Sequence, residues 1–170
     1  MKWNLSSSSD PLALRVVDGT GPFEGLGHHY SRRTPGSKTF TGVGREIVLL
    51  HESGKAVWAC VYQMTPFAKG SGGTRGRAGD TDRKARYVWR NMLFRNLGAG
   101  LSSALIQSAT EETYRQWIIR YGELPEGRLR TEVEVSSVKS SNPGFCYLAA
   151  GWIHDRYARG KRYLWAPSNR

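Results

Sequence analysis

Short runs of apolar residues, each bounded by glycine, proline, asparagine or serine, recur along the chain. Runs rich in branched and aromatic residues with such boundaries are typical of β-strands. This pattern predicts strands over residues 12–17, 46–52, 55–63, 85–94, 129–135, 152–157 and 161–165. Ser53 and Gly54, which separate the second of these strands from the third, are typical of a hairpin turn, so the two strands should pair antiparallel.

Helical patterns are fewer. After the fourth predicted strand, apolar residues recur at the spacing of one helix face, which predicts a helix over residues 101–121. An asparagine–proline pair at the start and a glycine at the end favour a short helix within residues 142–151. Residues 25–36 combine histidines, arginines and glycines with little apolar surface, so we expect a loop or short helix built for contacts, or simply a solvated basic face.

These elements, strands interspersed with helices, predict an α/β fold. A chain of 170 residues is long enough for one domain with a substantial core and too short for two. We assign this domain to residues 11–170. Residues 1–10 are rich in serine and should form a flexible N-terminus.

Positive charge changes the expected class of partner. The formal net charge is +11, the isoelectric point is near 10.1, and the excess is carried mostly by arginine, which suits bidentate contacts to phosphate. Nucleic acid is therefore the leading class of partner. The alternative is a basic but otherwise ordinary protein, because charge alone specifies no function.

Residues 68–84 form a glycine-rich stretch that is too basic and too polar to bury itself. We interpret the stretch as a mobile basic loop that grips a phosphate backbone, with a solvated hairpin connection as the alternative. With two arginines of the 25–36 segment, the candidate DNA contacts are Arg32, Arg33, Lys69, Arg75, Arg77, Arg83 and Lys84.

No segment approaches the length of a membrane-spanning helix, and the N-terminus has no apolar run of the signal-peptide kind. We therefore expect a cytoplasmic protein without membrane association. Cys60 and Cys146 stand far apart in apolar settings, which favours buried free thiols over a disulfide or a zinc site.

Residues 94–106 pass from strand chemistry to helix chemistry through Gly98 and Gly100. Glycines at such a turn allow backbone N–H groups to face outward at a helix N-terminus, where the helix dipole also favours an anion such as pyrophosphate. The alternative is an ordinary turn in which Ser102 or Ser103 caps the helix.

Two motifs resemble the GNAT acyltransferases. Arg95 to Gly100 matches the R-x-x-G-x-G pyrophosphate loop of these enzymes, and Asn142 to Trp152 resembles their segment in which an asparagine precedes a short helix with a tyrosine and a Gly-aromatic end. The predicted order of elements is also that of the GNAT fold, so the resemblance implies a mixed, mostly antiparallel central sheet flanked by helices. The resemblance implies acetyl-coenzyme A as cofactor, bound by Arg95, Asn96, Gly98, Gly100, Ser102 and Asn142.

A more specific resemblance is to the Mom family of phage DNA-modifying proteins. It rests on His29-Tyr30-Ser31, on Phe94-Arg95-Asn96 with Leu101-Ser102-Ser103, on Thr131-x-Val133-Glu134, and on the stretch from Asn142 to Trp152. The resemblance implies a GNAT-derived enzyme of the infected bacterial cell that converts adenine in double-stranded DNA to its N6-carbamoylmethyl form and so protects phage DNA from restriction. It also implies acetyl-coenzyme A or another small donor, and iron.

The chain departs from the Mom pattern at two places. Glu134 stands where the family has an aspartate, which keeps the carboxylate and moves it by one methylene. The glycines at 98 and 100 are closer to an ordinary acetyltransferase loop than to the serine-containing Mom version. Binding of coenzyme A therefore stays open.

Adenine N6 is a poor nucleophile, so an enzyme must position it, remove a proton and stabilise charge on the donor. Glu134 is the candidate for positioning or deprotonating the amine, and otherwise an exposed strand carboxylate. Tyr147 is the candidate acid, and otherwise a core aromatic residue. Arg95 and Ser103 would hold an oxygen of a ligand beside the strand-to-helix turn.

Tyr30 completes the candidate catalytic set and, with His29 and Glu134, forms a candidate set of iron ligands. Two other functions remain open. One is a conventional acetyl-coenzyme A-dependent N-acetyltransferase of a small-molecule or protein amine. The other is a non-catalytic, DNA-binding relative of the GNAT enzymes.

Overall fold

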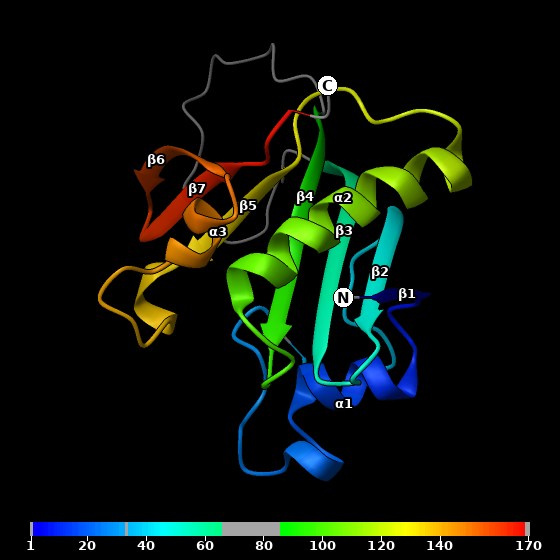
Figure 1. The fold of residues 1–170 in the computed structure, drawn as a ribbon, viewed down its shortest axis with the longest axis vertical. Coiled ribbons are helices and arrows are strands. Elements are labelled where there is room, and N and C mark those ends of the chain that lie inside the picture. Colours follow the sequence, from blue (N-terminus) through cyan, green and yellow to red (C-terminus); the bar gives the residue numbers. More distant parts are fainter. Residues whose placement is uncertain (1, 33, 66–85, 169–170) are drawn as a thin grey trace, which may run out of the picture.

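The computed structural model describes residues 2–32, 34–65 and 86–168, so Arg33 and the predicted basic loop at 68–84 lie outside the described residues. The described chain forms a single domain built on one seven-stranded sheet (Figure 1). Its strands are β1 (Trp3–Ser6), β2 (Arg45–His51), β3 (Ala56–Thr65), β4 (Arg86–Asn96), β5 (Arg130–Glu134), β6 (Ile153–Ala158) and β7 (Lys161–Trp165).

The strand order across the sheet is β1-β2-β3-β4-β5-β7-β6. All neighbours pair antiparallel except β4 and β5, which are parallel. The prediction of a mixed, mostly antiparallel sheet is therefore confirmed, as is the hairpin between β2 and β3.

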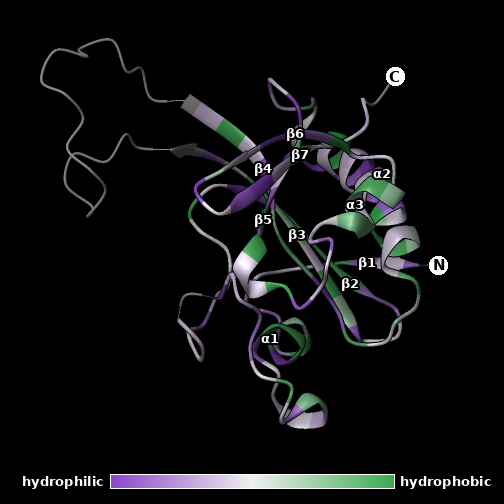
Figure 2. Ribbon diagram, turned by 90° about the vertical axis from the view of Figure 1, so that its left-hand side faces the viewer, coloured by the Kyte–Doolittle hydropathy of each residue, from purple (hydrophilic) through white to green (hydrophobic). Residues whose placement is uncertain are grey.

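Helices cover both faces of this sheet (Figures 1 and 2). The helical elements are α1 (Pro11–Asp18), α2 (Ser102–Tyr121), α3 (Phe145–Ala149) and the 3-10 turns η1 (Gly21–Phe23) and η2 (Val135–Ser137). Because side chains alternate along a strand, β3 feeds two cores. Trp58 and Cys60 pack with α2 and α3, and Val57 and Ala59 pack with α1.

Helix α2 has the bounds that its periodicity predicts, within one residue at its start. Among the helices that the structure describes, none combines the length and the apolar character needed to span a bilayer. Cys60 is buried and Cys146 partly buried, both as free thiols.

The segment at residues 12–17, predicted as a strand, is the helix α1. Asp10 caps it, since its carboxylate accepts from two backbone N–H groups of the first turn, and a left-handed glycine ends it. The buried side chains Ala13, Val16 and Val17 have helical spacing. The sequence of a run this short, with two valines, is compatible with either a helix or a strand. The Asp10 cap favours the helix.

Residues 1–10, expected to be flexible, contain the edge strand β1, which pairs antiparallel with β2. Trp3 is buried, and its Nε1 donates to the hydroxyl of Ser108 on α2 at 2.9 Å. The buried side chain of Trp3 therefore anchors a segment whose serine content had suggested flexibility. The described part of residues 25–36 consists of turns, as predicted.

Two irregularities of β4 shape the middle of the sheet. Its register with β3 shifts between Ala59 and Cys60, which places a bulge in β4. Its parallel pairing with β5 covers two residue pairs, the second of which joins Asn91 to Thr131. Beyond that pair the strands continue toward their carboxyl ends unpaired with each other, which is where ligands usually bind in open α/β sheets.

Candidate functional site

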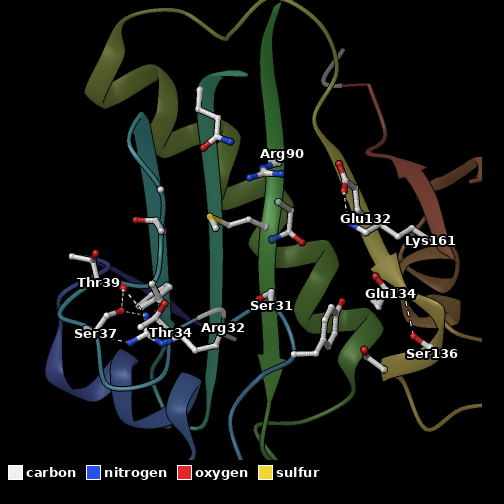
Figure 3. A pocket seen from close by; sticks show the side chains of 18 residues that line it. Ser31, Arg32, Thr34, Ser37, Thr39, Arg90, Glu132, Glu134, Ser136 and Lys161 are labelled. Atoms are coloured by element: carbon white, nitrogen blue, oxygen red, sulfur yellow. Dashed lines mark hydrogen bonds and ion pairs between the residues drawn. The ribbon is translucent and has the colours of Figure 1, made fainter. Parts of the chain in front are cut away.

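A cavity of about 750 Å³ opens on the face of the sheet that carries α1 (Figure 3). Side chains of β3, β4, β5 and β7 line one side of it, and the segment between residues 30 and 42 lines the other. Hydroxyl groups and charges of both signs dominate this lining. The cavity therefore suits a polar ligand, and its volume is within the range of about 300–1,000 Å³ typical of small-molecule sites.

Tyr30 and Glu134, both predicted to be catalytic, meet at this cavity. Glu134 is the last residue of β5, and its carboxylate accepts a long hydrogen bond of 3.3 Å from the Ser136 hydroxyl. Among the described residues no cation forms an ion pair with it. The hydroxyl of Tyr30 lies near the backbone and the charge of Glu134. A phenol and a carboxylate with no ion-pair partner in the described part of the chain thus face the same space.

Tyr30 is protonated at neutral pH. As a residue it is 41% exposed, yet the burial of its hydroxyl end raises its pKa to about 12, and the negative charge of Glu134 acts in the same direction. Its ring lies against that of His29, with 4.3 Å between ring centroids. The hydroxyl therefore keeps its proton at neutral pH and can donate a hydrogen bond to a ligand, but it cannot serve as a base.

A second carboxylate in the cavity, Glu132, is compensated. It accepts from Arg130 Nη2 and from Lys161 Nζ, each at 3.2 Å. Glu132 and Glu134 lie two residues apart on β5 and so face the same side of the sheet, as Figure 3 shows. Of the two carboxylates, Glu134 is the one available to a substrate amine.

Tyr147 lies on the opposite side of the sheet, within a buried polar network. Its hydroxyl donates to Asn91 Oδ1 at 2.7 Å, and burial raises its pKa well above the usual range. The Asn91 amide also donates to the carbonyls of Ala59 and Leu93, which lie beside the β4 bulge. Thr131 Oγ1 lies 3.2 Å from Asn91 Oδ1. Tyr147 would have to break this network to act as an acid.

Arg95 is placed differently from its prediction. Its guanidinium donates to the carbonyls of Val17, Leu26 and Gly27 at 2.8, 3.2 and 2.7 Å, on the face that carries α1. The side chain is buried and is not among the residues that line the cavity. Arg95 therefore positions the segment that leads to Tyr30 and holds no cofactor in this arrangement.

Arg32, predicted to contact DNA, is buried in an ion pair instead. Its Nε donates to Asp18 at 2.6 Å, and its Nη groups donate to Ser37 and to the Thr39 carbonyl. The ion pair and a hydrogen bond from the Gly36 amide lower the pKa of Asp18 against the opposing effect of burial. This clamp fixes the cavity wall between residues 32 and 39.

His29 has its Nδ1 occupied. Nδ1 accepts from the backbone N–H of Ser31 at 3.2 Å and lies 2.8 Å from the Ser31 hydroxyl. Burial and the nearby charge of Arg95 lower its pKa to about 4, so the ring is neutral at pH 7 with its hydrogen on Nε2. Within the described residues no group of three or more His, Cys, Asp and Glu side chains could hold a metal ion.

The glycine turn before α2 is organised by Asn96. Its Oδ1 accepts from the N–H groups of Gly98 and Ala99, and its Nδ2 donates to the Gly100 carbonyl and the Ser102 hydroxyl. The amides expected to face a phosphate are thus partly used within the turn. No side chain caps the helix at Leu101, so its first turn keeps N–H donors for an anion.

Two other residues that were predicted to contact a ligand, Ser103 and Asn142, lie outside the cavity. Ser103 is half-buried in the first turn of α2. Asn142 precedes α3, and its Oδ1 accepts from Arg162 Nη1 at 2.7 Å. Neither residue reaches the cavity that Tyr30 and Glu134 line.

Thr131 belongs to one of the Mom-like blocks but was assigned no role there. The site residues that the sequence did not single out include Asn91, Glu132 and Lys161. Each is an alternate residue of a strand, where polar side chains are ordinary. The available signal was Asn91, an uncharged polar residue between Trp89 and Leu93, which both face a core.

Geometry and motif resemblance are the grounds on which this site is interpreted. The structure brings Tyr30 and Glu134 together, places Tyr147 behind them across the sheet, and turns Arg95 and Arg32 into structural clamps. No protein-family model, curated protein or solved structure matches the chain.

Proposed function

We propose that this protein is a transferase that modifies an amino group held in the cavity between Tyr30 and Glu134, and that its substrate is adenine in DNA. The observation that carries the proposal is the pairing of a protonated phenol with a carboxylate that has no ion-pair partner among the described residues, beside the carboxyl ends of β4 and β5, which are not paired with each other. The Mom-like blocks and the net charge of +11 support DNA as substrate.

The proposed reaction requires two things of the protein: removal of a proton from the amine, and positioning of the reactants. Adenine N6 becomes nucleophilic when a base takes its proton as the new bond to carbon forms. Glu134 accepts that proton, and the donor's leaving group departs with the electron pair of the bond that breaks. The Tyr30 hydroxyl donates a hydrogen bond and fixes the ring or the donor oxygen.

We propose that the anionic part of the small donor binds where α2 begins, and that its reactive carbon extends to the cavity through the gap where β4 and β5 are not paired with each other. Ser102 and Ser103 offer hydroxyl groups and uncapped backbone N–H groups to an anionic part of a donor such as acetyl-coenzyme A. When bound, such a donor supplies an activated carbon. The succession of β4, the glycine turn and α2, which the GNAT resemblance implies, supports this placement.

Iron fits this arrangement poorly. The Nδ1 lone pair of His29 is taken by Ser31, and its Nε2 carries the hydrogen. Coordination would require the ring to release Ser31 or to exchange its tautomer. The proposed reaction therefore uses no metal.

Nucleoside digestion and mass spectrometry of DNA from cells that express the chain test the proposal. We expect an adduct on adenine N6, and about 100-fold less of it with Glu134→Gln, which removes the base and keeps the shape. Glu123→Gln, an exposed carboxylate outside the cavity, is the matched control. Absence of any adenine adduct, with expression of the protein verified, would overturn the proposal.

A conventional N-acetyltransferase is the second candidate, favoured by the glycine turn that opens onto the uncapped start of α2. That function predicts thiol release from acetyl-coenzyme A with a small amine and no dependence on DNA. Tight DNA binding without product under either condition would instead identify a non-catalytic DNA-binding protein.

A further inference from the structure

A strip of aromatic rings lies on the α2 face of the sheet, away from the cavity. Tyr87 stacks on Tyr62, with 5.2 Å between ring centroids and 22° between planes. Tyr62 in turn meets the edge of Trp117, which contacts Tyr121 at 4.9 Å. Trp117 is buried, whereas Tyr87 is 60% exposed. The strip is therefore anchored in the core at one end and open at the other.

Two arginines complete this surface. The guanidinium groups of Arg45 and Arg120 lie over the ring of Tyr121, 5.4 and 5.6 Å from its centroid. Arg45 is also the cross-strand partner of Tyr62, so cations and rings alternate over a short distance. The Tyr121 hydroxyl is fixed by both backbone groups of Glu46.

The neighbouring carboxylate does not compensate these arginines. Glu46 alternates with Arg45 along β2 and turns its side chain to the other face, where it accepts from Ser8 and Thr41. We call the surface formed by Tyr62, Tyr87, Tyr121, Arg45 and Arg120 the aromatic platform. Its composition, open rings beside cations, is the one that binds nucleobases and phosphates together.

We propose that the aromatic platform binds an unpaired stretch of DNA, with a base stacked on Tyr87 and the backbone phosphates held by Arg45 and Arg120. The inference rests on the proposed function in its choice of DNA as partner. A protein surface is a weaker match, because nothing in such a partner requires both stacking faces and a net charge of +11.

The platform and the cavity lie back to back at the end of the sheet where β3 finishes and β4 begins. Tyr62 and Gln63 are consecutive in β3; Tyr62 faces the platform and Gln63 lines the cavity. A strand held on the platform therefore stays close to the substrate site without filling it. Extrusion of a target base costs a few kcal/mol, and holding the displaced DNA by stacking would offset part of that cost.

Binding of two oligonucleotides of equal length and charge, one with bases and one abasic, tests the platform. We expect the full chain to bind the base-bearing strand about tenfold more tightly. Tyr87→Ser should abolish that preference, and Tyr87→Phe should retain it. Tyr157→Ser, on the far edge strand β6, is the control, since Tyr157 is also 60% exposed.

Equal binding of the two strands by the wild type would overturn the proposal, as would a preference that survives Tyr87→Ser or is lost equally with Tyr157→Ser. Arg45→Gln with Arg120→Gln should weaken both strands alike. Failure of the proposed function would leave these binding results unchanged, because the binding measurements need no donor and no product. Base-dependent binding without an adenine adduct would support the proposal for the aromatic platform and contradict the proposed reaction.

Discussion

Burial makes the imidazole of His29 a pH-sensitive part of the fold. Burial, followed by the charge of Arg95, lowers its pKa to about 4 from a usual value of 6.5. The unfolded chain thus binds a proton that the folded chain resists. The contribution of His29 to stability is complete above about pH 6.5 and is lost as the pH falls toward 4. We expect the free energy of unfolding in urea to decrease over that interval.

A histidine variant isolates this effect. His29→Gln should show a weaker pH dependence of unfolding between pH 6.5 and 4 than the wild type. His154→Gln, in the exposed strand β6, should leave the dependence unchanged. Identical pH profiles for His29→Gln and wild type would contradict the assigned environment of the ring.

Asn91 shows how a single amide can decide a local structure. The carbonyls of Ala59 and Leu93 lie beside the bulge in β4, and the Asn91 amide donates to both while its oxygen accepts from Tyr147. A buried polar group is tolerated only when its hydrogen bonds are made. In the sequence, Asn91 is one polar residue in a strand, and neither the bulge nor the partner across the sheet can be derived from it.

At the scale of elements, Arg95 determines where the segment from Val17 to Tyr30 lies. Arg95→Gln loses most of the bonds to three carbonyls, so Tyr30 should lose its fixed position. We expect kcat for adenine modification to fall about 10- to 100-fold, with an unchanged KM for the donor, because a misplaced group costs transition-state geometry rather than donor binding.

Kinetic parameters measured against donor concentration distinguish this positioning role from the role that the resemblance implies. A raised donor KM with unchanged kcat would show that Arg95 binds the cofactor after all. Arg95→Lys keeps the charge but cannot reach three carbonyls at once, so it should recover only part of the activity.

The elements differ in how far the sequence determined them. α2 was predictable because its twenty residues repeat one apolar face several times. The eight residues of α1 contain too few repeats, and β-branched residues in them favoured a strand. The approach of Tyr30 to Glu134 depends on contacts far apart in sequence. Only the motif resemblance suggested it, and no local pattern could.

For the molecule as a whole, the net charge of +11 predicts that salt affects DNA binding and the modification reaction to different extents. Affinity for DNA should fall steeply with salt, by about 10³- to 10⁵-fold between 50 and 200 mM if six to ten phosphates are contacted. Modification of free adenosine, which has no phosphate, should change little over the same range. Filter binding and product analysis at matched salt concentrations measure the two quantities.

The residues outside the described structure enter this prediction through their charge alone. Neutralising Lys69, Arg75, Arg77, Arg83 and Lys84 together should reduce the slope of log affinity against log salt, because fewer counterions are released on binding. The modified base should stay the same, since phosphate contacts position a protein on DNA and carry no base identity. An unchanged slope in that variant would place the phosphate contacts elsewhere on the domain, with Arg45 and Arg120 the next to be tested.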